Sequence, residues 1–288
     1  MSVSTSQQIA RFFNDFSTNE VTFTKDVIRA TLLHTKQVFL KILGFQYPCI
    51  VYSSSLVGAK VIVNLHDGLR QALAKSNNLC SLRFSFLQRD NSDPISFFVS
   101  ARINGMTPYG EQKPQLHFLN LQYTQRPPDD LIEVIGSLLE ANANAKRRKE
   151  ERIVITADTL TKLGIASKGS VVIVDGIPRK GLLRDVSFSG AKVIIMGVAK
   201  FIVNKPAVLR LELQEPRQTL EIAGEVVRFE GVEGRNDIAA FALKFNEETV
   251  PMEYKVRLSS YFRQGRRAPI TKQPPPGEPQ DPKATAGQ

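Results

Sequence analysis

The stretch Asp185-Val-Ser-Phe-Ser-Gly-Ala-Lys-Val-Ile-Ile195 has a near-copy in the first half of the chain, Ser53-Ser-Ser-Leu-Val-Gly-Ala-Lys-Val-Ile-Val63. The two stretches align without a gap and share six of eleven residues, including a serine and the glycine three positions after it. Further along, Leu116–Tyr123 corresponds in the same way to Ile238–Phe245. Chance recurrence of β-rich sequence is the alternative, but order and spacing both hold. We therefore interpret the chain as a tandem duplication of one structural module.

Most of the chain consists of short runs rich in Val, Ile, Leu, Phe and Tyr, separated by turn-forming residues. Runs of this kind predict β-strands. The predicted strands are Pro48–Tyr52, Lys60–Leu65, Ser81–Leu87, Ile95–Ile103 and Gln115–Tyr123 in the first half, and Ile153–Ile155, Ser170–Val174, Lys192–Met196, Ala207–Leu213, Thr219–Phe229 and Ile238–Phe245 in the second. Because the strands do not alternate with long helices, the pattern predicts a mainly β protein with two tandem small antiparallel barrels.

Each predicted barrel is followed by a helix that begins near a proline. The stretch from Pro127 to Asp130 opens the first helix, with an aspartate as its expected N-cap. Apolar residues then recur at helical spacing until Asn142 and Asn144, where we expect the helix to fray. The second helix is predicted over Pro251–Phe262. We therefore expect three parts: a barrel with its helix (1–144), a second barrel with its helix (145–264), and a disordered proline-rich tail (265–288).

The positive charge is concentrated in the second half of the chain. The net charge is +10, and residues 145–288 hold 25 of the 38 Lys and Arg against 17 of the 28 Asp and Glu. This excess predicts an anionic partner, such as a nucleotide, nucleic acid, acidic protein or lipid headgroup, with solvated surface charge as the alternative.

The sequence also bears on the cellular location. No apolar run approaches the ~18 residues of a membrane helix, so no membrane insertion is expected. The N-terminal residues carry neither a charged region nor an apolar region of the kind found in export signals. Cys49 and Cys80 are isolated thiols, as in proteins of a reducing compartment. Together these features predict a cytoplasmic protein.

The segment Lys146-Arg-Arg-Lys-Glu-Glu-Arg152 places five cationic side chains in seven positions, between the first helix and the second barrel. We predict that this arginine segment is both a hinge and half of an anion-binding site, and that the serine turn Asp185–Gly190 is the other half. Arginine holds phosphate bidentately and stacks on a base, whereas an ionised aspartate accepts from the N–H edge of guanine. A ligand with two phosphates and two guanines would satisfy these groups together. The first module has Ser53 in place of Asp185 and no paired arginines.

The two halves of this site resemble the two signatures of PilZ domains. The arginine segment is similar to Arg-Arg-x-x-x-Arg, and the serine turn is similar to (Asp/Asn)-x-Ser-x-x-Gly. The resemblance covers residues 145–263, with a longer spacing between the signatures that we assign to a loop around residues 162–169. Because the first module resembles a degenerate PilZ-like barrel, the whole chain is similar to two-module receptors of this family.

The resemblance implies that the chain binds cyclic di-GMP. In that family the paired arginines hold phosphate and stack on guanine, while the aspartate and serine read a guanine edge. Carried over by motif position, the expected ligand-binding residues are Arg147, Arg148, Arg152, Asp185, Ser187 and Gly190.

The favoured function is therefore that of a second-messenger receptor. Its ligand would order the hinge, fix how the barrels face each other and regulate a downstream protein partner, in motility, transcription, secretion or adhesion. The alternative is a nucleic-acid-binding regulator that uses the basic second module, with the ligand as a gate. An enzyme is not expected, because the sequence contains no acid–base constellation, nucleophile elbow or phosphate-binding glycine loop. No metal site and no cofactor are expected either.

Overall fold

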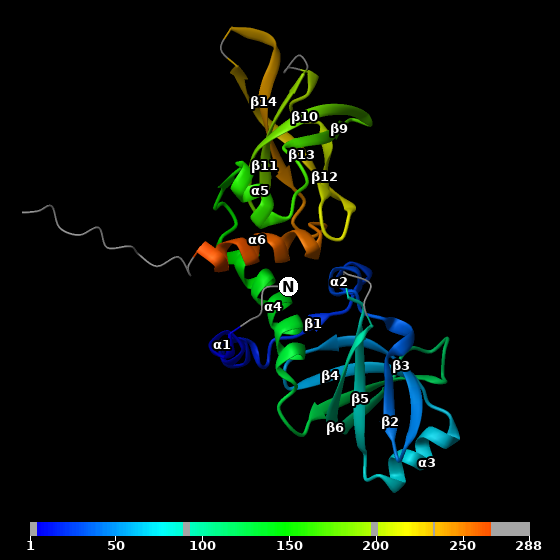
Figure 1. The fold of residues 1–288 in the computed structure, drawn as a ribbon. Helices are drawn as coiled ribbons and strands as arrows, with labels where there is room; N and C mark the ends of the chain where they lie inside the picture. Colours follow the sequence, from blue (N-terminus) through cyan, green and yellow to red (C-terminus); the bar gives the residue numbers. More distant parts are fainter. Residues whose placement is uncertain (1–4, 89–92, 197–200, 233, 266–288) are drawn as a thin grey trace, which may run out of the picture.

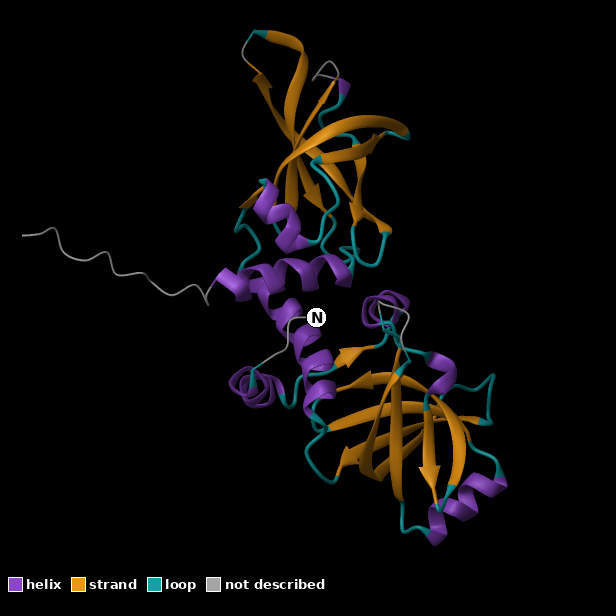
Figure 2. Ribbon diagram, in the orientation of Figure 1, coloured by secondary structure: helices purple, strands orange, loops and turns teal. Residues whose placement is uncertain are grey.

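The computed structural model describes residues 5–88, 93–196, 201–232 and 234–265 (Figure 1). Two antiparallel β-barrels, each followed by a helix, make up most of the molecule (Figure 2). The predicted fold class is thus confirmed. The proline-rich tail that we predict to be disordered lies outside the described residues from position 266 onward.

The first barrel has six strands and a short additional one. The strands are β2 (Phe39–Ile42), β3 (Phe45–Ser54), β4 (Gly58–Asn64), β5 (Leu79–Phe86), β6 (Ile95–Pro108) and β7 (Leu116–Tyr123). They pair in the order β3-β2-β5-β6-β7-β4, and the pairing of β3 with β4 closes the barrel. The two-residue strand β1 (Val21–Thr22) adds to the end of β3. Alternate side chains point inward and form the core, as in β4, where Val61 and Val63 are buried.

The second barrel repeats this topology. Its strands are β9 (Gly169–Val174), β10 (Ile177–Val186), β11 (Gly190–Met196), β12 (Pro206–Leu213), β13 (Gln218–Val232) and β14 (Arg235–Phe245). They pair in the order β10-β9-β12-β13-β14-β11, and β10 closes onto β11. The short strand β8 (Ile153–Val154) adds to the end of β10, as β1 adds to β3. The sequence prediction missed β10.

Several short helices were also missed. They are α2 (Lys25–Thr31), the 3-10 turn η1 (Thr35–Gln37), α3 (Asp67–Lys75) and α5 (Ala157–Leu163). Helix α5 occupies part of the region that we assigned to a loop. Helix α1 (Ser6–Phe16) packs against the long helix α4 (Asp129–Arg147). The N-cap of α4 is Pro128, without a side-chain cap, instead of the predicted aspartate.

Helix α4 does not fray at Asn144, contrary to the prediction. Asn144 is buried, and its Nδ2 donates a hydrogen bond to Ser259 Oγ at 2.8 Å. Ser259 belongs to α6 (Met252–Gly265), which packs against α4 and against α2 of the first module (Figure 1). The asparagine that sequence reasoning took as a helix terminator therefore joins the final helices of the two modules.

Helix α6 is also capped by the first module. The backbone N–H of Met252 donates to Asp26 Oδ2 of α2 at 2.6 Å. This bond satisfies one of the free N–H groups at the start of a helix, where a negative charge is also favoured by the helix dipole. Met252 belongs to the core of the first module, and Val256 packs against that core. Among the described residues, no helix is long and apolar enough to cross a membrane.

Candidate functional site

The arginine segment begins at the C-terminal end of α4. Arg147 is the last residue of the helix, and the N–H of Arg148 caps it by donating to the carbonyl of Asn144 at 2.8 Å. Cationic side chains at this end are stabilised by the negative end of the helix dipole. Lys149 forms an ion pair with Glu247, and that hydrogen bond raises the pKa of Lys149. The segment is thus anchored at its start and at its middle.

The serine turn meets the arginine segment through Arg152 and Asp185. Asp185 follows a β-bulge in β10, where the pairing with β11 shifts register. Strand β8 pairs with β10 at Asp185 itself, through Val154. Arg152 immediately precedes β8, so its side chain reaches Asp185, and its Nη1 donates to Asp185 Oδ1. The side chains of Arg152 and Asp185 are 34% and 16% exposed.

The other two arginines point elsewhere. Arg148 Nη1 donates to Glu151 Oε2 at 2.6 Å, and its guanidinium lies 5.0 Å from the centre of the Phe262 ring in α6. The Phe262 ring in turn stacks on Phe188 of the serine turn, with 6.1 Å between ring centres. Arg147 is exposed and donates to Asn144 Oδ1. Of the three predicted arginines, Arg152 is the one with a described contact to Asp185.

Ser187 is fully buried in this structure. Its Oγ donates to the carbonyl of Gly190 at 3.3 Å, and its own carbonyl accepts a hydrogen bond from Tyr254 Oη of α6 at 2.8 Å. Burial raises the pKa of Tyr254, so the hydroxyl stays protonated and remains a donor. The serine turn is therefore held in shape from within and by α6.

Gly190 is required by the sheet. A Cβ at this position would overlap the carbonyl oxygen of Leu243 in the neighbouring strand β14. Of the two roles that glycine offers, a positive φ or a close backbone approach, the structure therefore uses the second. The backbone that comes close is the protein's own.

Sequence reasoning missed Ser189 and Glu150, two polar residues where the arginine segment meets the serine turn. Ser189 Oγ donates at 3.0 Å either to the Lys149 carbonyl or to Glu150 Oε1, and the Ser189 N–H also donates to the Lys149 carbonyl. Both residues occupy variable positions of the two signatures, so motif matching passes over them. Their bonds hold the arginine segment down on the serine turn.

The equivalent junction in the first module has the same geometry and different chemistry. Glu20 stands where the second module has Arg152, and Ser53 stands where it has Asp185, each 132 residues earlier. Ser53 Oγ donates to Glu20 Oε1, so a hydrogen bond between a hydroxyl and a carboxylate takes the place of the Arg152–Asp185 ion pair. Because an acidic residue replaces the arginine, this junction would repel a phosphate.

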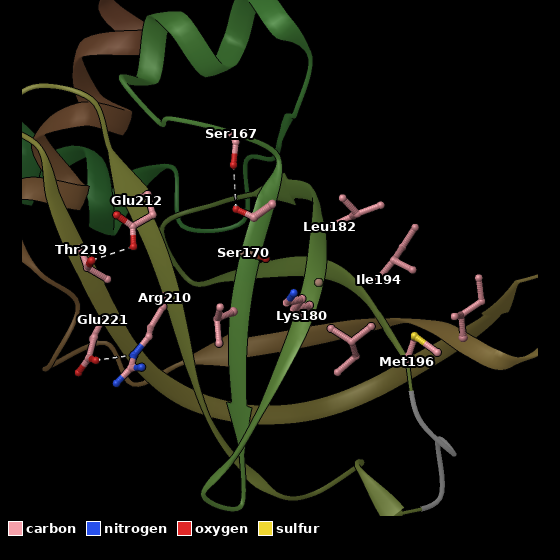
Figure 3. Close-up of a pocket in the computed structure, with 15 residues that line it drawn as sticks. Ser167, Ser170, Lys180, Leu182, Ile194, Met196, Arg210, Glu212, Thr219 and Glu221 are labelled. Atoms are coloured by element: carbon pink, nitrogen blue, oxygen red, sulfur yellow. Dashed lines mark hydrogen bonds and ion pairs between the residues drawn. The ribbon is translucent and has the colours of Figure 1, made fainter.

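Two cavities flank the arginine segment. The first, which we call the Arg148 cavity, has a volume of about 310 Å³ and lies between α1, α4 and α6. The second has a volume of about 580 Å³ and is lined by Lys146, Lys149 and Ser189. A third cavity of about 820 Å³ lies on the second barrel, where Leu182, Ile194 and Met196 line it (Figure 3). None of the six predicted site residues lines this third cavity.

Comparisons with known proteins agree with the two-module organisation. Residues 7–142 match the PilZN3 domain, and residues 146–263 match the PilZ domain. A protein of Treponema denticola described as a cyclic di-GMP binding protein is 41% identical over 262 residues, which cover 91% of this chain and 83% of that protein.

Two solved bacterial structures are among those that the chain matches. The crystal structure of the Borreliella burgdorferi PlzA protein in complex with c-di-GMP shares 24% identity and covers 89% of this chain and 99% of that chain, with a TM-score of 0.41. The structure of the Bacillus subtilis inhibitor of motility MotI/DgrA shares 13% identity. The match covers 80% of this chain and 96% of that chain, with a TM-score of 0.30.

Proposed function

This chain belongs to the PilZ domain family, and from that premise we propose that it is a cytoplasmic receptor that binds cyclic di-GMP without catalysing a reaction. The proposed ligand-binding residues are Arg147, Arg148, Arg152, Asp185, Ser187 and Gly190. Residues 1–144 form the first domain of this receptor and residues 145–264 the second.

The contact between Arg152 and Asp185 carries the proposal. It joins the two signatures of the family, which lie 33 residues apart in the sequence. A guanidinium and a carboxylate in contact offer a ligand one group for its phosphate and another for the N–H edge of its guanine. The equivalent pair in the first module, Glu20 and Ser53, lacks the cation. We therefore assign ligand binding to the second module.

Binding has to displace contacts that this structure already makes. Asp185 is occupied by Arg152, and Ser187 is buried in the serine turn, whose Ser189 is hydrogen-bonded to the arginine segment. We propose that the segment Lys149–Arg152 lifts from the serine turn, so that the ligand takes the place of its hydrogen bonds. The affinity is then set by how far the hydrogen bonds to the ligand exceed in free energy those that the segment gives up.

Calorimetric titration tests this function. The full-length protein is titrated with cyclic di-GMP, and with GTP, cyclic di-AMP and a short single-stranded oligonucleotide for comparison. We expect saturable binding of cyclic di-GMP at micromolar or lower concentration, with much weaker heats for the other three. Chromatography of the mixture is expected to recover the ligand intact. An absence of binding to cyclic di-GMP contradicts the proposal, and its turnover contradicts the assignment as a receptor.

We further propose that binding changes the geometry between the modules and so regulates a downstream protein partner. Arg148 stacks on Phe262 of α6, and α6 contacts α4 and α2. If Arg148 turns to a phosphate of the ligand, α6 loses this cation–π contact, worth about 0.5–2 kcal/mol. The packing of α6 between the two modules would then adjust.

Small-angle X-ray scattering with and without cyclic di-GMP is expected to give different curves for the wild-type protein. The Asp185→Ala variant serves as the control, since its curve is expected to stay the same when the ligand is added. Identical wild-type curves, at ligand concentrations where calorimetry shows saturation, would rule out the change of geometry while leaving the receptor function intact.

A further inference from the structure

Three guanidinium groups from three helices surround the Arg148 cavity. Arg11 comes from α1 of the first module, Arg148 from the end of α4, and Arg263 from α6. The acidic residue that lines the cavity is Glu140, which lies 3.3 Å from Arg11 Nη2 and 3.6 Å from Arg263 Nε. Arg11 and Arg148 also pair with Asp15 and Glu151, but neither of these carboxylates lines the cavity, so the three guanidinium groups meet one carboxylate within it. Such a place attracts a phosphate.

One carboxylate oxygen of Glu140 accepts no hydrogen bond from the described residues. Its side chain is only 6% exposed, and its Oε2 is buried without a hydrogen-bond partner among the described residues. The 3.6 Å separation from Arg263 Nε is an ion pair that is too long for a hydrogen bond. Buried carboxylate oxygens are normally hydrogen-bonded, so an oxygen left without a donor indicates a missing partner. The N–H edge of guanine presents donors of this kind.

The same cavity offers surfaces for stacking. Phe262 lines it with the Arg148 guanidinium 5.0 Å from the centre of its ring, and Arg148 Nε is buried without a hydrogen-bond partner. Aromatic rings and guanidinium planes both stack on bases. The volume of about 310 Å³ is at the lower end for ligand pockets, which suits half of a dinucleotide better than a whole one.

We propose that the Arg148 cavity is a second recognition site, which takes one guanine nucleotide half of a cyclic dinucleotide. Glu140 accepts from the N–H edge of its base, the base takes the place of the Arg148 guanidinium on the Phe262 ring, and Arg11 and Arg263 hold its phosphate. The identity of the ligand rests on the proposed function, but the residues are new: Arg11, Glu140 and Arg263 lie outside both signatures. The site also contains residues of both modules, so its occupation links them directly.

Arg11→Gln tests the site, with Arg126→Gln as the matched control. Both arginines are about half exposed, and both form a surface ion pair with a nearby aspartate at 3.2 Å, but Arg126 lies outside the cavity. In titrations of full-length protein with cyclic di-GMP, we expect Arg11→Gln to weaken binding by about tenfold or more, or to remove a second bound molecule. Arg126→Gln is expected to bind as the wild type does.

Arginine modification gives a readout that a purely structural role of Arg11 would not change. The wild-type protein is treated with phenylglyoxal, and each site is followed by mass spectrometry. Cyclic di-GMP is expected to protect Arg11 and to leave Arg126 reactive. Unchanged affinity of Arg11→Gln, or equal reactivity of Arg11 with and without ligand, overturns the second site. If Asp185→Ala still loses binding in that case, the proposed function stands. A wild-type protein that does not bind cyclic di-GMP refutes both.

Discussion

Replacing Asp185 with alanine is expected to abolish detectable binding of cyclic di-GMP. The substitution removes the acceptor proposed for a guanine edge and also the carboxylate that positions Arg152. Charge-assisted hydrogen bonds are worth about 1.5–3 kcal/mol each. The loss of two such contacts therefore weakens binding by roughly a hundredfold or more. Arg148→Ala is expected to have the same effect on binding. Calorimetric titration measures the loss in both variants.

The fold is expected to survive the Asp185→Ala substitution. The Arg152 side chain is one-third exposed and can turn to solvent, and partly exposed ion pairs stabilise proteins by no more than about 1 kcal/mol. Circular dichroism checks this. The matched control is Asp158→Ala, which removes a carboxylate from a more exposed ion pair with Lys162 in the same module and is expected to leave binding unchanged. Wild-type affinity in Asp185→Ala would refute the assignment of the site.

Gly190→Ala is expected to destabilise the second barrel by about 3 kcal/mol. The new Cβ would overlap the Leu243 carbonyl oxygen, and since that atom belongs to the backbone of β14, neither strand can move aside cheaply. Thermal unfolding followed by circular dichroism is expected to show a midpoint lower by roughly 10 °C for this module.

Two other glycines make this prediction specific. Gly58 occupies the same place in the first module, where an added Cβ would lie 2.6 Å from the Leu121 carbonyl oxygen. Gly58→Ala is therefore expected to destabilise the first barrel in the same way. Gly231 has open space around it, and Gly231→Ala is expected to be nearly neutral. If Gly190→Ala unfolds at the wild-type temperature, the close approach of β11 and β14 is not what this position requires.

The sequence predicted the fold well because the repeat and the apolar strands can be recognised from short stretches of sequence. Strand β10 was missed for two physical reasons. Four of its ten residues, Arg179, Lys180, Arg184 and Asp185, are charged, and they do not fall on one face of the strand, so the apolar alternation is weak. The bulge before Asp185 also interrupts the alternation by which strands are recognised. The short helices were missed because α2 and α5 have only seven residues each, about two turns, which leave little periodicity to detect.

The contacts within the candidate site could be predicted from the sequence only in part. The signatures named Arg152 and Asp185, and the structure brings these two together. The direction of Arg148 depends on Phe262, more than a hundred positions later in the sequence, and no local pattern contains that information. The complete burial of Ser187 likewise depends on the turn and on Tyr254 of α6. Contacts of this kind are set by tertiary packing.

The bond from the Met252 N–H to Asp26 affects how the two halves can be separated. A fragment that begins at residue 145 would keep α6 but leave its first turn without a carboxylate partner, and would expose Met252 and Val256 to water. Part of the last helix of the second module is thus completed by residues of the first. The second barrel would keep this bond in another protein only if α2 were transferred with it. Binding measured on truncated versions would reflect the newly exposed surface of α6 as well as ligand recognition.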